Sequence, residues 1–460
     1  MRTLEILIPI ILAGYLGWPK PRPLLVMLLP LATLLVVAVH LLLEGYRWEM
    51  VPLYLLTLSL SVTAVLGLLR KTEQKPGFPF VLLGLVVVFT AVPVLVPVPA
   101  VAKPAGPFAV GTRSFELIDP SRKEIWSGKD ENRRLLVKLW YPALPAVGDK
   151  LAPWMDNALI YAPALAEYMG LPSFSLDHLA LASTPAFSES KLAPQSGGYP
   201  LVLFSHGWKG FDSQNTGEAL ELASRGYVVA ALQHTYGAIV TVFPDGSVAK
   251  NNPEALPDGA PSDVYEASAH RLVAQWTGDL HFALDFLEAQ SAASTGPLAG
   301  AVDATRVGVY GHSTGAGAAI QFAVSDDRVK AVLGMDPFMR PVAPEVIVSG
   351  LTKPSFFLFS QKWTDDTASR NNQLFASFLV NTTGTLGINS ITGTAHLDFC
   401  DLPLLSPLAP LIGLKGPISG SRVTEILNSY LVAFFDQTLQ NKPSQLFAGQ
   451  RPFAEVVARK

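Results

Sequence analysis

The sequence contains a single cysteine, Cys400, among 460 residues. One cysteine excludes both an internal disulfide framework and a zinc site built from cysteines. Charge is also scarce: charged residues make up 15% of the chain and the net charge is −3, so nothing favours a nucleic-acid partner. The histidines show no metal-ligand spacing such as H-E-x-x-H. We therefore expect no metal and no nucleic acid.

Hydrophobic residues are abundant, and they are concentrated at the N-terminus. The apolar stretches there are Leu4–Trp18, Leu24–Leu43, Val51–Leu69 and Phe78–Val101. A bilayer core requires ~20 mostly apolar residues, so the last three are long enough, whereas the first is short and contains Glu5. We predict a transmembrane region of about four helices in residues 1–102, with the first span left open, and a separate domain over residues 103–460.

Basic residues between these stretches predict the orientation in the membrane. They fall in the first break, with Lys20 and Arg22, and in the third, with Arg70, Lys71 and Lys75. Under the positive-inside rule these breaks are cytoplasmic. The large domain is then extracytoplasmic, tethered to the cell or inner membrane, with the bilayer as a partner. His40 and Glu44 lie near the end of a stretch, where an interfacial position is expected rather than a proton relay.

A glycine-rich motif in the second half of the chain predicts a nucleophile. The apolar run Arg306–Tyr310 leads into Gly311-His312-Ser313-Thr314-Gly315, and small residues follow. This is G-x-S-x-G between an expected strand and an expected helix, the setting of a nucleophile elbow. So tight a turn presents the serine hydroxyl above the sheet, and the glycines remove side chains that would clash there. Ser313 is the predicted nucleophile.

The rest of the domain alternates short apolar strands with helices. Tyr199–Ser205 is a continuous apolar run, typical of a strand buried on both faces, and a long amphipathic helix is expected at about Val264–Ala289. Such alternation gives a parallel sheet with right-handed crossovers. Together with the elbow it predicts an α/β-hydrolase fold. Residues 149–194, rich in Pro, Ser and Ala, are expected to form loops and short helices covering a site.

The serine requires a base and a carboxylate that orients the base. In this fold the chain order is serine, acid, histidine, and His396 is the only histidine after Ser313, so it is the predicted base. The acid is open between Asp336, at the end of the strand after the elbow helix, and the pair Asp365 and Asp366 after the next strand.

The amides of Trp208 and Thr314 are the expected oxyanion donors, because one follows the nucleophile and the other lies in an earlier strand–helix loop. His206 and His312 flank these turns and are expected to hold loops rather than transfer protons. The acidic residues of the long helix are expected to be solvated; these are Asp263, Asp279 and Asp285.

The ordered set of motifs resembles the plasma-type platelet-activating factor acetylhydrolases, and bacterial esterases of that group are similar too. The motifs are Phe204-Ser205-His206-Gly207, the elbow, Leu333–Phe338 and the surroundings of His396. The resemblance implies that Asp336 is the acid. It also implies hydrolysis of short or oxidised acyl esters of phospholipids without calcium or another cofactor.

Two other functions are compatible with the sequence. The first is a broad-specificity carboxylesterase, related to dienelactone hydrolases, acting on non-phospholipid esters. The second is a membrane-anchored domain that binds a partner without catalysis. The intact order of Ser313, Asp336 and His396 argues against the second.

Overall fold

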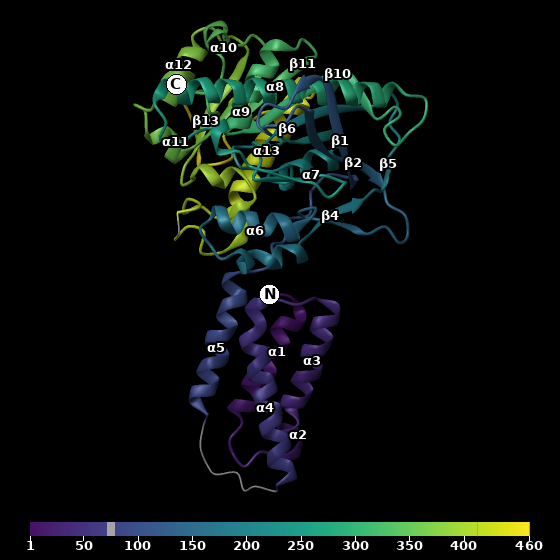
Figure 1. Ribbon diagram of the computed structural model, residues 1–460, viewed down its shortest axis with the longest axis vertical. Helices are drawn as coiled ribbons and strands as arrows, with labels where there is room; N and C mark the ends of the chain where they lie inside the picture. Colours follow the sequence, from purple (N-terminus) through teal and green to yellow (C-terminus); the bar gives the residue numbers. More distant parts are fainter. Residues whose placement is uncertain (71–78, 412, 460) are drawn as a thin grey trace.

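A bundle of apolar helices stands below a larger mixed α/β unit in the computed structural model (Figure 1), which describes residues 1–70, 79–411 and 413–459. The bundle contains α1 (Thr3–Gly17), α2 (Leu24–Met27), α3 (Leu29–Leu43), the short 3₁₀ helix η1 (Trp48–Met50), α4 (Val51–Leu69) and α5 (Phe80–Leu95). Their outward surface is apolar: Leu25, Leu42 and Leu69 are each at least three-quarters exposed. Such a surface suits a lipid environment.

Two of the predicted spans have the length and hydropathy to cross a membrane. They are Leu24–Leu43, of 20 residues, and Trp48–Leu69, of 22 residues, and membrane anchors and signal sequences share these properties. Helices α1 and α5 are apolar but have only 15 and 16 residues, about 22–24 Å at ~1.5 Å per residue, against a bilayer core of ~30 Å. The presence of four membrane spans therefore stays a prediction. Phe78, Lys71 and Lys75 lie outside the described residues.

The α/β unit is built on one large sheet of mostly parallel strands. Its order is β14-β13-β12-β11-β10-β6-β7-β2-β1-β4-β3, with β5 paired to β2. The strands are β1 (Ala109–Lys123), β2 (Asn132–Leu144), β3 (Leu151–Pro153), β4 (Ser183–Ser188), β5 (Lys191–Leu192), β6 (Tyr199–Ser205), β7 (Val228–Gln233), β10 (Val302–His312), β11 (Val329–Met335), β12 (Ser355–Ser360), β13 (Thr385–Ile391) and β14 (Val456–Ala458). A separate hairpin pairs β8 (Val240–Val242) with β9 (Val248–Lys250).

Helices cover both faces of the sheet, which explains the continuous apolar strands. Leu201 and Leu203 of β6 face one core, and Val202 and Phe204 face the other. The first core includes residues of α8 (Ser262–Ala292), α9 (Thr314–Ser325), α10 (Pro344–Ser349) and α12 (Arg370–Leu379); the second includes residues of α7 (Thr216–Ser224) and α13 (Gly420–Leu439). The remaining short helices are α11 (Gln361–Asp365), η3 (Pro253–Ala255), η4 (His396–Phe399) and η5 (Leu402–Leu405).

The structure corrects the prediction for residues 149–194. This segment forms α6 (Ala158–Tyr168) and the 3₁₀ segment η2 (Ser173–Leu181), as expected, but it also adds β3, β4 and β5 to the sheet. The hydrophobic pattern missed these strands because they are short and lie at the sheet margin, where β4 pairs with β1, β5 pairs with β2 and β3 pairs with β4. Two strands that flank the parallel part of the sheet, β2 and β14, are antiparallel to their neighbours β7 and β13.

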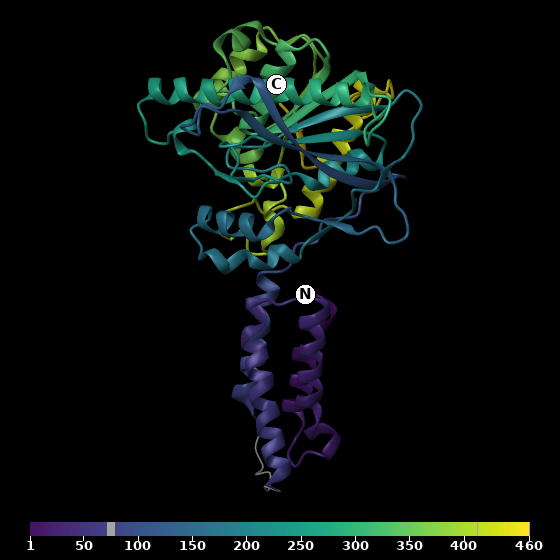
Figure 2. The ribbon, with the colours of Figure 1, turned by 45° about the vertical axis from the view of Figure 1, so that its right-hand side comes forward.

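Polar contacts join the bundle to the α/β unit, with α6 and η2 lying between them (Figures 1 and 2). The Trp48 indole N–H donates to the Ser175 carbonyl at 3.3 Å. His178 Nδ1 lies 2.7 Å from Glu49 Oε1, both side chains being buried. Within the bundle, next to Trp48 and Glu49, buried Arg47 pairs with Glu5 at 3.0 Å. His178 is therefore structural, and the two parts dock through specific groups.

Candidate active site

Ser313 occupies a strained turn between strand and helix. It follows β10, precedes α9 and has φ 57° and ψ −122°. Its backbone N–H donates to the Met335 carbonyl of the neighbouring strand at 2.9 Å. A non-glycine residue with positive φ persists only where its surroundings fix it, and such a conformation is that of a nucleophile elbow.

Backbone crowding explains the two glycines of the motif. A Cβ on Gly311 would lie 2.4 Å from the Gly315 carbonyl oxygen, and one on Gly315 would lie 2.1 Å from the Ser205 carbonyl oxygen. Real Cβ atoms do not approach this closely, and backbone atoms cannot rotate away as side chains do. The motif therefore reflects close packing of the turn against β6 as well as the exposure of Ser313.

Asp336 and His396 meet at the carboxyl edge of the sheet. Asp336 follows β11, His396 opens η4 after β13, and His396 Nδ1 lies 2.9 Å from Asp336 Oδ2. Asp336 is fully buried; it also accepts hydrogen bonds from the Ser360 N–H at 2.7 Å and the Ser360 hydroxyl at 2.6 Å. These bonds suit an ionised carboxylate. The proton of neutral His396 then sits on Nδ1, which leaves Nε2 as an acceptor.

Two aromatic rings hold the His396 imidazole. Trp363 stacks on it at 4.3 Å and 17°, and His312 lies on it at 4.4 Å. His312 is buried, and this burial, together with the neighbouring His396, keeps its pKa well below the ordinary value. Its Nε2–H donates to the His396 carbonyl at 3.1 Å, while Nδ1 accepts from the Gln214 amide at 3.0 Å. His312 therefore holds a loop, as expected.

The predicted nucleophile, base and oxyanion donors line one cavity of about 260 Å³. Ser313, His396, Trp208 and Thr314 line it, and Asp336 lies behind His396. The rest of the wall is largely apolar, with Leu165, Tyr168, Leu256, Tyr265, Phe338, Trp363, Leu397 and Leu402. Asp365 and Asp366 are exposed and are not among the lining residues.

The loop after β6 lies directly against the elbow. A Cβ on Gly207 would be 3.3 Å from Ser313 Cβ, closer than most Cβ contacts, so glycine allows the loop to approach Ser313 without a shift. Within residues 1–70, 79–411 and 413–459, the N–H groups of Trp208 and Thr314 have no hydrogen-bond acceptor. Two unpaired N–H groups beside a serine are the arrangement that stabilises an oxyanion.

The sequence did not indicate that Ser360, Trp363 and Gln214 contact Asp336, His396 and His312. The prediction that Asp279 is solvated was wrong. Nothing in the sequence distinguishes the first three from ordinary strand-end and loop residues. Asp279, expected to be solvated, is fully buried and pairs with Arg133 at 2.6 Å. That pairing holds the pKa of Asp279 well below its usual range, against the effect of burial. The expectation failed because this face of α8 packs on the sheet.

A metal at His312, Asp336 and His396 does not fit the arrangement. These residues offer ligand atoms within 4.8 Å of one another. Both ring nitrogens of His312 already have partners, and the Asp336 oxygens take the bonds from Ser360 and His396. Binding an ion there would break these bonds.

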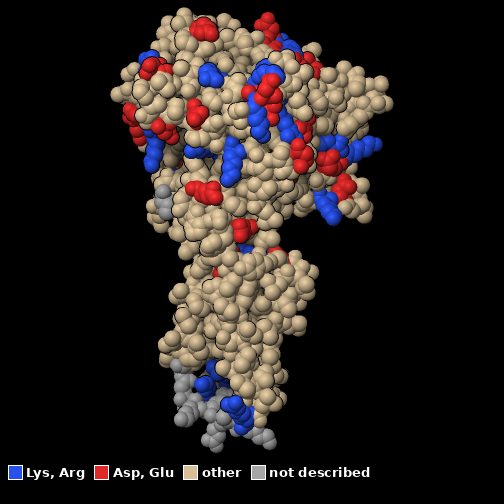
Figure 3. Space-filling model, viewed as in Figure 1, with Lys and Arg blue, Asp and Glu red and all other residues tan. Residues whose placement is uncertain are grey.

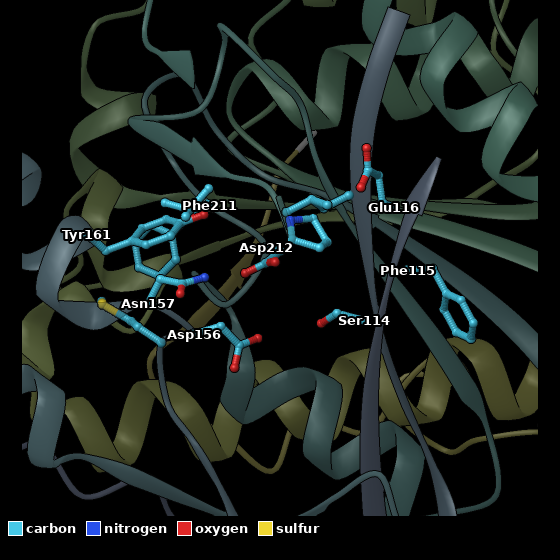
Figure 4. Close-up of a pocket in the computed structure, with 12 residues that line it drawn as sticks. Ser114, Phe115, Glu116, Asp156, Asn157, Tyr161, Phe211 and Asp212 are labelled. Carbon is cyan, nitrogen blue, oxygen red and sulfur yellow. The ribbon is translucent and has the colours of Figure 1, made fainter. Parts of the chain in front are cut away.

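A second cavity, of about 170 Å³, has Phe211 in its lining, as does the first (Figure 4). The carboxyl groups of Asp156 and Asp212 turn toward it. Burial raises the pKa of Asp212, and the Asp156 charge adds to this rise, while the Lys138 charge opposes it. Lys138 also pairs with Asp156 at 3.0 Å. The second cavity therefore combines carboxyl groups with an apolar wall that includes Phe115, Met155 and Phe211.

The chain is similar to known esterases over most of its length. The model of the family "Platelet-activating factor acetylhydrolase, isoform II" matches residues 97–266 and 284–446. A platelet-activating factor acetylhydrolase of Cavia porcellus is 25% identical over 359 residues, covering 74% of this chain and 78% of that protein. A probable 1-alkyl-2-acetylglycerophosphocholine esterase of Arthroderma benhamiae is 26% identical over 390 residues, covering 77% and 92%.

A solved structure of an esterase is also similar to this chain. The ferulic acid esterase of Streptomyces cinnamoneus superposes with a TM-score of 0.64 at 29% identity, covering 79% of this chain and 100% of that one. The mostly parallel sheet is the one expected of an α/β hydrolase. The chain therefore belongs to the platelet-activating factor acetylhydrolase family, and it is an ester hydrolase.

Proposed function

We propose that this ester hydrolase works through Ser313 as nucleophile, His396 as base and Asp336 as the acid that orients the base. The observation that carries the proposal is the 2.9 Å contact between Asp336 and His396 at the wall of the cavity that Ser313 also lines. Exposed Asp365 and Asp366 have no comparable contact with His396 among the described residues. A buried carboxylate on Nδ1 leaves Nε2 available for the serine proton.

The proposed reaction transfers an acyl group to water. His396 Nε2 takes the Ser313 proton as the hydroxyl oxygen attacks the ester carbonyl, and the Trp208 and Thr314 N–H groups donate to the resulting oxyanion. When the tetrahedral intermediate collapses, the C–O bond to the leaving alcohol breaks and His396 gives that oxygen its proton. Water then repeats the sequence on the acyl-enzyme, releasing a carboxylic acid and free Ser313.

The proposed substrates are phospholipids that carry a short or oxidised acyl chain. Support comes from the family and from the small, largely apolar cavity, in which Leu165, Phe338 and Leu402 can contact such a chain. A broader carboxylesterase activity is the second candidate. It is favoured by the likeness to a ferulic acid esterase and by the aromatic side chains Trp208, Tyr265 and Trp363 in the cavity wall.

A substrate panel separates these candidates. The full chain in detergent micelles is assayed with short-chain phosphatidylcholine, p-nitrophenyl acetate and methyl ferulate, with Ser313→Ala as the blank. We expect the highest kcat/KM on the phospholipid and loss of all activity in Ser313→Ala. A higher kcat/KM on methyl ferulate would favour the second candidate. Activity that survives in Ser313→Ala would reject the proposed nucleophile.

We further propose that the N-terminal helices anchor the enzyme, with its catalytic unit outside the cytoplasm. Basic residues gather at the end of the bundle that faces away from the α/β unit (Figure 3). Lys20 and Arg22 follow α1, and Arg70 ends α4. Basic loops stay in the cytoplasm, so the opposite end is extracytoplasmic. Alkaline phosphatase fused after Lys460 is expected to be active; activity of only a cytoplasmic reporter at that position would contradict the orientation.

A further inference from the structure

His206, at the start of the loop after β6, has both of its ring nitrogens occupied. Nδ1 lies 2.7 Å from the Gly207 carbonyl oxygen, and Nε2 lies 3.2 Å from the His234 backbone nitrogen. A carbonyl oxygen only accepts and a backbone N–H only donates. Both contacts therefore assign the same neutral tautomer, with the proton on Nδ1. The ring is completely buried, so water does not compete for either bond.

The Gly207 carbonyl belongs to the same peptide unit as the Trp208 N–H. In a planar trans peptide the C=O and the N–H point in opposite directions. The carbonyl is fixed by two donors, His206 Nδ1 and the Gly210 N–H, the latter at 2.9 Å. Fixing it also fixes the direction of the Trp208 N–H, one of the two unpaired donors beside Ser313.

We propose that His206 is a positioning residue, which aims the Trp208 N–H at the oxyanion by holding the Gly207 carbonyl. This inference rests on the proposed function, because it supposes an oxyanion beside Ser313. His206 transfers no proton in this role. It stays neutral because burial lowers its pKa to about 3.

Buried side chains hold His234, whose backbone N–H donates to His206. His234 Nδ1 lies 2.9 Å from Asp279, its Nε2 accepts from the Ser205 hydroxyl at 2.9 Å, and its ring stacks on Trp276 at 4.3 Å. Asp279 also pairs with Arg133. Ser205, His234 and Asp279 thus have the connectivity of a catalytic triad.

This second array is closed to substrate, because all three of its residues are fully buried. What it provides is a rigid support. The His234 backbone N–H is held in place for His206 Nε2, and His206 lies 5.1 Å from the His234 ring and 5.2 Å from Trp276. The loop after β6 must leave the Trp208 N–H unpaired, and the contacts of His206 with His234 and Trp276 keep that loop in one geometry. A donor that is already in position is the kind that stabilises an oxyanion.

Two substitutions of nearly equal shape test the proposal. His206→Asn keeps an amide N–H close to the position of Nδ1, whereas His206→Leu has the same branching without a donor. We expect His206→Leu to lower kcat by about 10²–10³, the cost of losing one oxyanion donor, with little change in KM. His206→Asn is expected to recover at least about tenfold of that loss, because it restores the bond to the Gly207 carbonyl.

A trifluoromethyl ketone distinguishes positioning from a general structural role, because it binds serine hydrolases as a tetrahedral oxyanion. Its inhibition constant is expected to weaken in His206→Leu by the same factor as kcat. His206→Gln, which retains a polar side chain but places its amide near Nε2, should behave like His206→Leu and provides a folded comparison if the leucine variant is unstable. His281→Leu loses bonds to Asp326 and Ser325 away from the cavity and should keep wild-type kcat.

Two results would overturn the inference while leaving the proposed function intact. One is a folded His206→Leu or His206→Gln variant with kcat within threefold of wild type. The other is a His206→Asn variant no more active than His206→Gln. If wild type and Ser313→Ala were equally inactive on every ester tested, the proposed function would fail, and the role of His206 would fail with it.

Discussion

Replacing Asp336 by asparagine should reverse the proton arrangement of His396 without changing the shape of the site. Asp336 accepts from the Ser360 N–H at 2.7 Å, the Ser360 hydroxyl at 2.6 Å and His396 Nδ1 at 2.9 Å. In Asp336→Asn the amide oxygen keeps the bond to the Ser360 N–H, which directs the NH₂ group toward His396. Two donors cannot face each other, so His396 shifts its proton to Nε2 and its Nδ1 becomes the acceptor.

The expected loss of rate follows from this change of tautomer. With Nε2 protonated, His396 cannot take the Ser313 proton, and the imidazolium formed during the reaction also loses its buried counter-charge. The equivalent substitution in a serine protease lowers kcat by about 10⁴, which corresponds to roughly 5.4 kcal/mol at ~1.36 kcal/mol per tenfold. KM should change little, because Asp336 lies behind His396 and does not line the cavity.

The assay is p-nitrophenyl acetate hydrolysis across pH 5–10, with thermal unfolding to check the fold. Asp365→Asn is the matched control, since it makes the same chemical change at an exposed carboxylate, and it should keep wild-type kcat. An Asp336→Asn variant that retains more than about a tenth of wild-type kcat would refute the tautomer argument. Loss of activity in Asp365→Asn or Asp366→Asn instead would show that the acid had been assigned wrongly.

Three further predictions concern packing and stability. Gly315→Ala should yield no folded protein, because its Cβ would lie 2.1 Å from the Ser205 carbonyl oxygen, whereas Gly420→Ala, in open space, should fold normally by circular dichroism. Asp279→Asn should lower the free energy of unfolding by about 3–5 kcal/mol, because it leaves buried Arg133 without its full counter-charge; exposed Asp285→Asn on the same helix should cost no more than about 1 kcal/mol in urea titrations. Burial raises the pKa of Glu218 from 4.5 to about 7, so the folded state retains a proton that the unfolded state releases. That contribution to stability is present below pH 4.5 and is lost as the pH rises through about 7. The melting temperature of wild type should therefore fall relative to that of Glu218→Gln between pH 5 and 8, and parallel curves would contradict the prediction.

The bundle and the elbow were predictable because their signals are local. A run of apolar residues specifies a helix or a buried strand whatever lies around it, and β6 begins and ends at the predicted residues, Tyr199 and Ser205. The elbow was identified by a strand, a glycine-bracketed serine and small residues in consecutive positions. His396 is the base predicted from the chain order of the fold, since no other histidine comes after Ser313.

The acid could not be chosen from spacing because Asp336, Asp365 and Asp366 all follow strands. Only the arrangement of β11, β12 and η4 brings one carboxylate to His396 and leaves the other two exposed. The error over Asp279 has the same origin. Helical periodicity does not reveal that Arg133, which is 146 residues distant, reaches the buried face of α8.

By itself, the sequence determined the inner strands, the main helices and the tight serine turn, because these depend on neighbours a few residues apart; the marginal strands β3, β4 and β5 were not evident from it. Only the tertiary structure decided which carboxylate meets His396, that Asp279 is an interior charge, and that His206 holds the peptide of Trp208. Those contacts join residues from different strands and helices, and hydrogen bonds form within about 3 Å, a separation that only the packed sheet establishes.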